Sequence, residues 1–479
     1  MRRASDNHGM GQNRLPPPWA GTEDARREIR RRRAVRNTKL VVLDDDPTGA
    51  QTLSDVAVLT DWQSDNLQQA FEDPGDLFYV LTNTRAHSPD EAREIDEDVV
   101  AALQAAAHRT GVTFDLVSRG DSTLRGHYPL EVDVLARVMQ VLTGVPYDAH
   151  LLVPAYLEEG RFTYHGWHYV RKGAQLVPVN ETEYAQDHVF GYRSADLRNW
   201  VEEKTAGRIA ARDCLVIPLE EVRAGPAVVA RRLAAARGNV PVVVDAMSYE
   251  DLDVLSLAVL EAQARGQRLL FRTASSFVKS YSGQPPTSGW IDAVPVPASL
   301  QGRGALVVVG SHVASTTRQL AHALEAVALK HVELDVQRLL SDGDRAPAVR
   351  EAALAVNEGL GQGEHVVVST SRAPVRGRER TDTLRIGQAV ADALVEVVQA
   401  VVTPPRLIII KGGITAREIS TRALNIRRAH VLGQISSGIS VWVGQPGSRW
   451  AGMAYIVFPG NVGDERALLD LLHRTLVDP

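Results

Sequence analysis

Three consecutive carboxylates stand near the start of the sequence, directly after an apolar stretch at residues 39–43. They are Asp44, Asp45 and Asp46, and Pro47-Thr48-Gly49 follows them. Adjacent carboxylates repel one another, which costs stability unless a cation or a donor-rich ligand offsets the repulsion. Their oxygens can accept hydrogen bonds from hydroxyl groups, bind Mg²⁺ or remove a proton from an attacking hydroxyl. Asp45 and Asp46 are therefore candidate catalytic residues, with a solvated acidic turn as the structural alternative.

Arginines with acidic and hydroxyl neighbours follow three further apolar stretches. Arg85 follows residues 77–81, the segment from Arg119 to Gly126 follows 114–118, and Arg161 follows 149–153. A guanidinium can hold a carboxylate through two parallel hydrogen bonds, and aspartates and hydroxyls suit alcohol groups. This combination predicts a site for a polyhydroxy acid, with surface arginines and structural loops as the alternatives. Asp121 joins the candidate catalytic residues, and the candidate substrate-binding residues are Thr48, Arg85, Arg119, Ser122, Arg125 and Arg161.

The second half of the chain has three glycine turns after apolar stretches. They are Gly310-Ser311, Lys411-Gly412-Gly413-Ile414-Thr415 and Pro459-Gly460-Asn461. Glycines let backbone amides approach phosphate groups closely, and the Thr415 hydroxyl can donate a hydrogen bond or help to hold Mg²⁺. The residue order of a P-loop is absent. Each turn alone is explained more simply as structural, but three of them favour a nucleotide site. The candidate nucleotide-binding residues are Ser311, Gly412, Gly413, Ile414, Thr415, Gly460 and Asn461.

Histidine and cysteine do not point to a metal centre. His165 and His168 have a spacing that metal ligands can have, but ordinary polar packing is the preferred interpretation. No metal site with direct protein ligands is therefore predicted. Cys214 is the single cysteine, lies in an apolar run and is expected to be a buried, inert thiol. One cysteine excludes an intrachain disulfide and fits a reducing cytoplasm.

Buried strands must position these residues, because the apolar stretches are short and rich in β-branched side chains. Helical patterns lie between them: Ser88-Pro89 followed by Glu91 is a typical helix start, and the apolar spacing of residues 383–402 predicts a long helix. Strands that alternate with helices predict an α/β protein with mostly parallel sheets, in which ligands bind at the carboxyl ends of strands. Residues 160–215 interrupt the alternation and are expected to be a functional insertion or a covering segment.

The length of 479 residues predicts two or three domains, and the alternation of strands and helices favours two, each a mostly parallel β-sheet flanked by helices. Residues 39–280 are expected to form the first domain and 305–479 the second, joined by a linker at 281–304 that is rich in proline and glycine. Residues 1–38 are expected to be an N-terminal extension that is mobile or lies on the surface. Its basic run at residues 30–33 leaves a polyanion-binding arm as the alternative.

The net charge and the lengths of the apolar stretches limit which binding partners are expected. The formal net charge is −5, so general binding to nucleic acid or to an anionic membrane is not expected, and an anionic ligand needs a local group of arginines or lysines. The sequence has no apolar stretch long enough for a transmembrane helix, and its first 38 residues lack the apolar core of a signal peptide. We expect a cytoplasmic protein, with a homodimer as one option for its assembly.

In this order, the segments resemble the four-carbon acid sugar kinase family, over roughly residues 39–475. The family pattern Asp-Asp-x-Thr-Gly matches residues 45–49, and Asp-Ser-Thr-Leu-Arg-Gly matches 121–126. Its later Gly-Arg, Gly-Ser, Gly-Gly-x-Thr and Gly-Asn segments match Gly160-Arg161, Gly310-Ser311, residues 412–415 and Gly460-Asn461. Two positions differ from the family: Ser118-Arg119 stand where it often has lysine, and His127 stands where it has asparagine.

The resemblance implies an N-terminal domain that binds a sugar acid and a C-terminal domain that binds ATP with Mg²⁺. It implies phosphorylation of the terminal hydroxyl of a threonate, an erythronate or a 3-oxo-tetronate, and the two departures leave the particular acid open. In that mechanism Asp45, Asp46 and Asp121 hold hydroxyl groups, and one of them accepts the proton of the attacking oxygen. The guanidinium groups that would hold the substrate carboxylate belong to Arg85, Arg119, Arg125 and Arg161.

Two other functions remain as alternatives. An NAD-dependent oxidoreductase of a hydroxy acid predicts a G-x-G-x-x-G loop after the first strand, and residues 39–60 contain none. A non-catalytic sugar-acid sensor predicts a ligand site without a working nucleotide site, which the glycine turns disfavour. ATP consumption separates the three functions.

Overall fold

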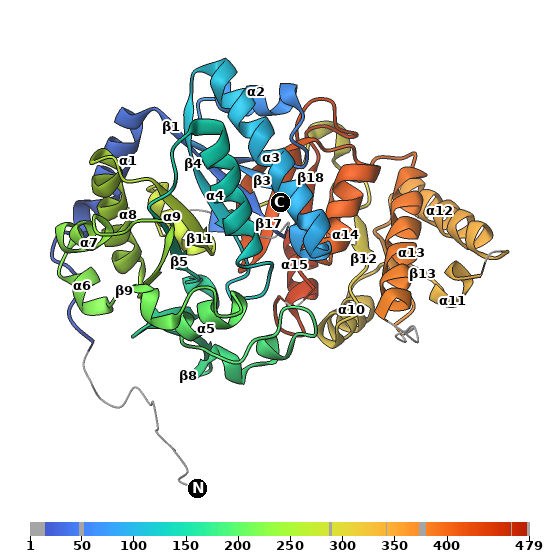
Figure 1. The fold of residues 1–479 in the computed structure, drawn as a ribbon. Coiled ribbons are helices and arrows are strands. Elements are labelled where there is room, and N and C mark those ends of the chain that lie inside the picture. Colours follow the sequence, from blue (N-terminus) through green and yellow to red (C-terminus); the bar gives the residue numbers. More distant parts are fainter. Residues whose placement is uncertain are drawn as a thin grey trace, which may run out of the picture.

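The structure is a computed structural model that describes residues 15–46, 52–286, 290–341, 343–372, 380–460 and 462–476. Thr48 and Asn461, two of the candidate site residues, lie outside these ranges. Helices and strands alternate through most of the chain, which confirms the predicted α/β class (Figure 1).

The first half of the chain contributes parallel strands covered by helices. Its strands in the main sheet are β1 (Thr38–Asp44), β2 (Val56–Leu59), β3 (Leu77–Leu81), β4 (Thr113–Arg119), β5 (Ala149–Val153), β9 (Leu215–Ile217), β10 (Val240–Val244) and β11 (Leu269–Thr273). Its helices are α1 (Thr22–Arg36), α2 (Ser64–Glu72), α3 (Pro89–Thr110), α4 (Leu130–Thr143), α5 (Leu197–Lys204), α6 (Leu219–Arg223), α7 (Pro226–Leu233), α8 (Tyr249–Ala264) and α9 (Ser275–Tyr281). Helix α3 begins as predicted, because Ser88 and Glu91 form a reciprocal capping box and Pro89 is the first helical residue.

The second half repeats this architecture and ends with an antiparallel hairpin. Its strands are β12 (Leu306–Val309), β13 (Lys330–Leu334), β14 (Val366–Thr370), β15 (Ile408–Lys411), β16 (Arg428–Ser436), β17 (Ile439–Gly444) and β18 (Ala454–Phe458). Its helices are α10 (Ala314–Ala326), α11 (Val336–Leu339), α12 (Arg345–Gly361), α13 (Arg380–Gln399), α14 (Gly413–Glu418) and α15 (Ala467–Leu476).

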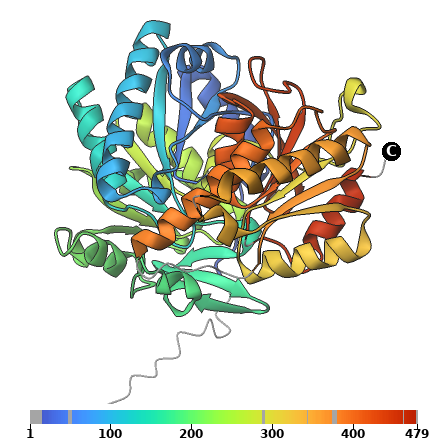
Figure 2. The same ribbon diagram turned by 90° about the vertical axis from the view of Figure 1, so that its right-hand side faces the viewer.

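One sheet runs through both halves, whereas the sequence predicted a separate sheet for each. Within the described ranges it has 15 strands, in the order β13-β14-β12-β15-β18-β17-β16-β2-β3-β1-β4-β11-β5-β10-β9. Strand β2 joins the halves by pairing antiparallel with β16 and parallel with β3. Figure 2 shows the two halves side by side, with helices packed on the sheet.

Ion pairs reinforce the junction between the halves. Arg427, just before β16, contacts Asp61 at 2.7 Å and Asp65 at 3.0 Å. Beside it, Arg428 pairs with Asp73, and His430 lies 2.7 Å from Asp55. The halves are therefore joined by backbone pairing and by side chains, in addition to the covalent linker.

The segment 160–215 forms a small antiparallel sheet that covers part of the first half. Its strands are β6 (Arg161–Tyr164), β7 (Trp167–Lys172) and β8 (Gln175–Pro178), followed by short turns and α5. Aromatic side chains hold the segment down: Tyr192 is buried and its hydroxyl donates to the Thr123 carbonyl at 2.7 Å. This is a covering segment, as one of the two sequence interpretations proposed.

Residues 22–36 of the expected N-terminal extension form helix α1, which lies against the first half, so the second of the two expected placements describes this segment. Ala25 and Ile29 are buried against the first half, and Arg33 is only 3% exposed. Arg26 pairs with Asp253 at 2.8 Å and Arg36 with Asp115 at 2.9 Å. These arginines are neutralised by acidic groups of the protein itself, which argues against α1 as a polyanion-binding arm.

Helix α1 is expected to contribute to the stability of the first half. Replacing Ile29, which is fully buried, with alanine should lower the free energy of unfolding by about 2–5 kcal/mol, because it leaves a cavity under the helix. Chemical denaturation measures the change. Val35 on the same helix is 78% exposed, so Val35→Ala is the matched control and should change stability by less than about 0.5 kcal/mol. Equal stability of I29A and V35A would show that α1 is only loosely docked.

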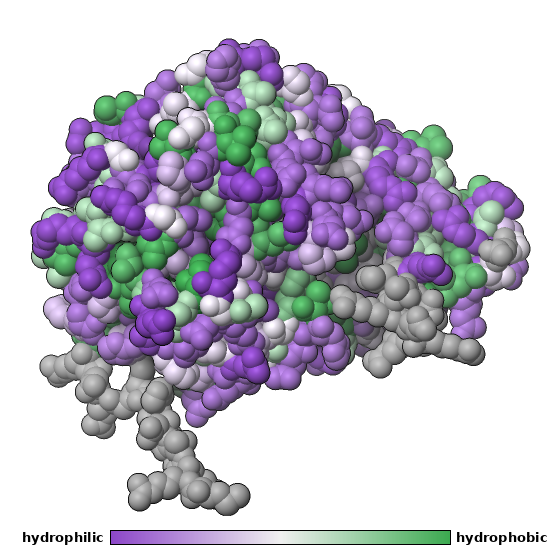
Figure 3. All heavy atoms as spheres, viewed as in Figure 1, coloured by the Kyte–Doolittle hydropathy of each residue, from purple (hydrophilic) through white to green (hydrophobic). Residues whose placement is uncertain are grey.

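The face of the molecule in Figure 3 is mainly hydrophilic, with apolar residues scattered over it. Among the described residues, no helix combines the length and the apolar character that crossing a membrane requires.

Candidate active site

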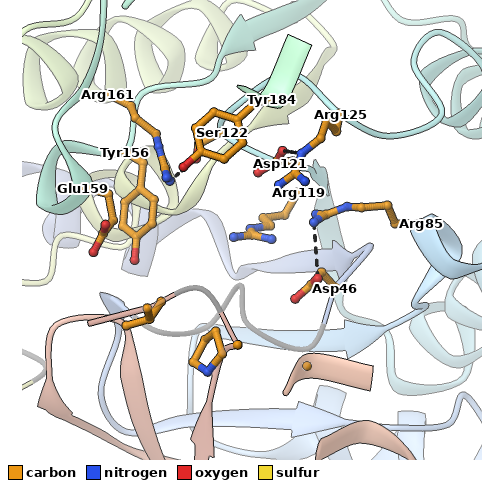
Figure 4. A pocket seen from close by; sticks show the side chains of 14 residues that line it. Asp46, Arg85, Arg119, Asp121, Ser122, Arg125, Tyr156, Glu159, Arg161 and Tyr184 are labelled. Atoms are coloured by element: carbon orange, nitrogen blue, oxygen red, sulfur yellow. Dashed lines mark hydrogen bonds and ion pairs between the residues drawn. The ribbon is translucent and has the colours of Figure 1, made fainter. Parts of the chain in front are cut away.

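The carboxyl ends of β1, β3 and β4 open into a pocket of about 200 Å³. Asp44, the last residue of β1, is in register with Leu81 of β3 and Arg119 of β4, so the residues after these strands meet at one edge of the sheet. The second half closes the pocket with the residues that follow β15 and β18 (Figure 4). The lining residues are Asp46, Arg85, Arg119, Asp121, Ser122, Arg125, Tyr156, Glu159, Arg161, Tyr184, Gly413, Pro459, Gly460 and Val462.

Two of the pocket arginines are paired with the acidic run. Arg85 holds Asp45 with two hydrogen bonds, from Nε to Oδ2 at 3.0 Å and from Nη2 to Oδ1 at 2.5 Å. Arg119, itself buried, lies 3.2 Å from Asp44. Burial raises the pKa of Asp44 to about 7, although the charge of Arg119 opposes the shift. Asp44 and Asp45 therefore form a buried, charge-compensated floor beneath the pocket.

Asp46 is the most accessible of the three candidate catalytic aspartates. Its side chain is 28% exposed, compared with 3% for Asp45 and 11% for Asp121. Arg85 Nη1 reaches one of its oxygens at 3.3 Å, a longer contact than the pair that holds Asp45. Figure 4 shows Asp46 facing the pocket opposite Arg125 and Asp121. Asp46 is the carboxylate that a ligand in the pocket can approach most directly.

Asp121 is held as a carboxylate on the other side of the pocket. Its Oδ2 accepts from Arg125 Nε at 2.6 Å and from the Thr123 hydroxyl. Burial alone would raise the pKa of Asp121, but the charges of Arg85 and Arg125 outweigh it and hold the pKa well below the ordinary value. Such a group is a strong acceptor for a ligand hydroxyl and a reluctant proton acceptor.

Arg161 differs from the other three pocket arginines in its pairing. In the described part of the chain, no carboxylate lies within ion-pair distance of its guanidinium, whereas Arg85, Arg119 and Arg125 each pair with an aspartate. Arg161 Nη1 donates to the Ser122 hydroxyl at 2.8 Å, and its buried Nε has no hydrogen-bond partner. A half-buried guanidinium without a nearby carboxylate among the described residues is unfavourable, so this position favours an anionic ligand.

Aromatic rings that the sequence did not single out flank Arg161. The guanidinium carbon lies 5.6 Å from the centre of the Tyr156 ring and 5.7 Å from that of Tyr184, and Arg125 lies 5.3 Å from the Tyr184 ring. Cation–π contacts of this kind orient a guanidinium without neutralising it. Glu159 also lines the pocket and accepts a hydrogen bond from Ser437 of the second half at 3.1 Å. Tyr156, Glu159 and Tyr184 were not among the site residues predicted from the sequence.

Of the two histidines with metal-ligand spacing, His168 packs in the interior and His165 is exposed. His168 is fully buried; its Nε2 lies 2.7 Å from the Ser122 carbonyl and its Nδ1 lies 3.1 Å from the Thr163 hydroxyl. Burial lowers the pKa of His168 to about 4, so its ring is neutral. His168 thereby supports the loop that carries Ser122. Cys214 is buried, as predicted.

The three glycine turns of the second half converge. A side chain on Gly310 would collide with Thr415 Oγ1, and one on Gly460 would collide with Ser311 Oγ. Gly412 has φ of 124°, a conformation that side chains rarely allow, and its Cα faces the Ser311 amide. Of the predicted nucleotide-binding residues, Gly413 and Gly460 line the pocket, whereas Ser311, Gly412 and Thr415 lie beside it and Ile414 is 62% exposed.

Lys411 is a buried residue that was not among the predicted nucleotide-binding residues. Its Nζ donates to the Pro459 carbonyl at 2.8 Å and lies 3.5 Å from the centre of the Phe458 ring. Burial lowers the pKa of Lys411 to about 7. The side chain ties the turn after β15 to the turn after β18.

Comparison with known proteins agrees with this two-part architecture. A family model described as a sugar-binding N-terminal domain matches residues 40–281, and one described as a nucleotide-binding C-terminal domain matches residues 306–468. These define a two-domain protein that combines a sugar site with a nucleotide site. The chain belongs to the four-carbon acid sugar kinase family.

Two curated relatives are kinases. The chain is 27% identical over 327 residues to a D-erythronate kinase of Heliobacterium modesticaldum, which covers 66% of this chain and 67% of the relative. It is 28% identical over 342 residues to a D-threonate kinase of Salmonella typhimurium, which covers 70% of this chain and 72% of the relative.

Solved structures share the fold. A Salmonella typhimurium protein described as a putative tRNA synthase has a TM-score of 0.64 at 19% identity, over 91% of this chain and 98% of the other. A Haemophilus influenzae protein has a TM-score of 0.60 at 16% identity, over 90% of this chain and 98% of the other.

Proposed function

We propose that the protein transfers a phosphoryl group from ATP to the terminal hydroxyl of a small sugar acid. The observation that carries this function is one pocket lined by both the sugar-binding and the nucleotide-binding parts of the chain. Phosphoryl transfer needs the acceptor and the donor in line in a site that excludes water, and little covalent chemistry from the protein. The kinase relatives act on four-carbon sugar acids, which fit a small polar pocket.

The substrate carboxylate binds Arg161 and the Ser122 hydroxyl. This end of the pocket has the guanidinium without a counter-ion, and Tyr156 and Tyr184 hold its plane. Asp121 accepts hydrogen bonds from the hydroxyls in the middle of the substrate. Arg85, Arg119 and Arg125 compensate the aspartates and keep the pocket positive enough for an acid.

Asp46 accepts the proton of the terminal hydroxyl as that oxygen attacks the γ-phosphorus. Of the three candidate aspartates it has the most exposed side chain, and its contact with Arg85 is longer than the contacts that tie Asp45 and Asp121 to arginines. Closer approach of the two halves on ligand binding removes the remaining water. The departing ADP stays with the second half.

The glycine turns after β12, β15 and β18 hold the ATP phosphates. Their backbone is unobstructed only because Gly310, Gly412 and Gly460 carry no side chain. The buried Thr415 hydroxyl beside them fits a role in holding Mg²⁺, which usually takes few protein ligands in addition to phosphate oxygens and water. Mg²⁺, when bound, neutralises phosphate charge.

A substrate panel tests the function. Purified protein is given Mg-ATP with both enantiomers of threonate and erythronate and with 3-oxo-tetronate, and ADP release is followed against a control without acid. We expect acid-dependent ADP formation with at least one compound. If the protein neither forms ADP nor binds ATP, the kinase function is overturned. ATP-independent reduction of NAD would favour the oxidoreductase alternative.

Gly412→Ala should weaken the nucleotide site selectively. The backbone at Gly412 has φ of 124°, and an added Cβ would lie 3.3 Å from the Ser311 amide, so the turn must deform. We expect KM for ATP to rise at least about tenfold while KM for the sugar acid changes little. Gly387→Ala is the matched control, because Gly387 is exposed within α13 and meets no neighbour. An unchanged KM for ATP in G412A would show that the turn at Gly412 does not contact the ATP phosphates.

A further inference from the structure

Arg372 stands at the carboxyl end of β14, next to the first glycine turn. Strands β14 and β12 are paired, with Ser369 opposite Val309, so the residues that follow them are neighbours. Arg372 Nη1 donates to the Ser311 carbonyl at 2.8 Å. Its Nε donates to the Thr370 carbonyl at 2.8 Å and its Nη2 to the Thr370 hydroxyl at 2.6 Å. The guanidinium is thereby fixed beside Ser311.

This guanidinium lacks a counter-ion. Over the ranges that the structure describes, no carboxylate lies within ion-pair distance of Arg372, and its three hydrogen-bond partners are neutral oxygens. Burial lowers the pKa of Arg372, and only the distant charge of Glu333 opposes this. Burial and the charge of Arg372 also lower the pKa of His312. Among the described residues, this corner of the second half therefore carries a guanidinium without an ion-pair partner, and Glu333 acts on it only through its charge.

The corner adjoins the convergent glycine turns. Ser311, whose carbonyl Arg372 holds, packs against both Gly412 and Gly460. An arginine has five N–H groups, and three bonds leave one N–H on Nη1 and one on Nη2 without a partner in these contacts. Two parallel donors on one guanidinium match two oxygens of a phosphate.

We propose that Arg372 binds a phosphate group of the nucleotide through the free N–H groups of Nη1 and Nη2. The assignment rests on the proposed function, because it needs a nucleotide at the glycine turns. It adds a cationic ligand to a phosphate site that otherwise consists of backbone amides and hydroxyls. The alternative is a purely structural role, in which Arg372 only braces the Ser311 turn.

Binding measurements separate the two roles. Isothermal titration of wild type, R372M and R372Q with ATP is compared with competition by adenosine, which has the base and ribose but no phosphate. R372Q keeps a side-chain amide that can donate to the Ser311 carbonyl, but it removes the charge and the forked donors of the guanidinium. We expect ATP affinity to fall about ten- to hundredfold in both variants, because a charge-assisted hydrogen bond is lost, while adenosine affinity stays within about twofold.

The control is Arg318→Met, which removes an exposed arginine of α10 that pairs with Glu465 at 2.6 Å. It should leave ATP affinity unchanged. Equal losses for ATP and adenosine, or no loss for either in R372Q, would overturn the assignment. If wild type itself does not bind ATP, the proposed function fails instead, so the two failures are distinguishable.

Discussion

Asp46→Asn is expected to lower kcat by about 10²–10⁴-fold with little change in the KM of either substrate. Asparagine keeps the shape of the side chain but cannot accept the proton of the attacking hydroxyl. The expectation follows from accessibility, because Asp46 is 28% exposed in the pocket while Asp45 is 3% exposed and held by Arg85 at both oxygens. Initial rates of ADP release at saturating ATP and sugar acid measure the effect.

A surface aspartate provides the control for this variant. Asp213 is 61% exposed, and within the described ranges its one ion pair is with its neighbour Arg212 at 3.9 Å, so Asp213→Asn should retain wild-type turnover. Thermal melting of D46N should match wild type. A kcat of D46N within about threefold of wild type would remove Asp46 as the base.

Arg161→Met is expected to abolish recognition of the acid group. The lost interaction is a charge-assisted hydrogen-bond pair, so KM for the sugar acid should rise about 10- to 150-fold, whereas KM for ATP should not change. Arg161→Lys keeps the charge but loses the planar, forked donors of the guanidinium. Its KM for the sugar acid should therefore lie between the values of wild type and R161M. The structural basis is that Arg161 is the pocket arginine with no carboxylate partner among the described residues.

Removing the charge from the ligand gives a sharper measurement. Wild type should strongly prefer a four-carbon acid to the corresponding neutral tetritol, and R161M should lose most of that preference. Arg193→Met removes an arginine of the same covering segment that is 89% exposed, and it should keep the preference. If R161M still discriminates acid from polyol as wild type does, the carboxylate binds another arginine.

Much of the pocket followed from one rule, that residues after parallel strands meet at one edge of a sheet. Residues 77–81 form β3 as predicted, and Arg85 after it lines the pocket. The same rule would have found Arg372, which follows β14 as Arg85 follows β3. Which arginines are neutralised could not be predicted. Arg85, after β3, reaches Asp45 at the end of the neighbouring strand β1, whereas no carboxylate of the described residues lies within ion-pair distance of Arg161.

Other features depend on contacts between distant segments. The apolar residues of α1 are few among many arginines, and the sequence does not show that Ala25 and Ile29 are the buried ones. The acidic partners Asp115 and Asp253 lie far along the chain. Tyr184 reaches Arg161 from a covering segment without a regular pattern. The single sheet depends on the pairing of β2 with β16, and the sequence of neither strand indicates which strand it pairs with.

The pairing of β2 with β16 has a consequence for folding during translation. Leu59 of β2 is paired with Arg428 of β16, so the first half is complete long before its neighbouring strand is translated. Until then β2 is an edge strand whose backbone N–H and C=O groups face solvent, which invites pairing with another nascent chain. The interval between translating these two strands is when misassembly is most probable, and a chaperone that covers β2 would act there.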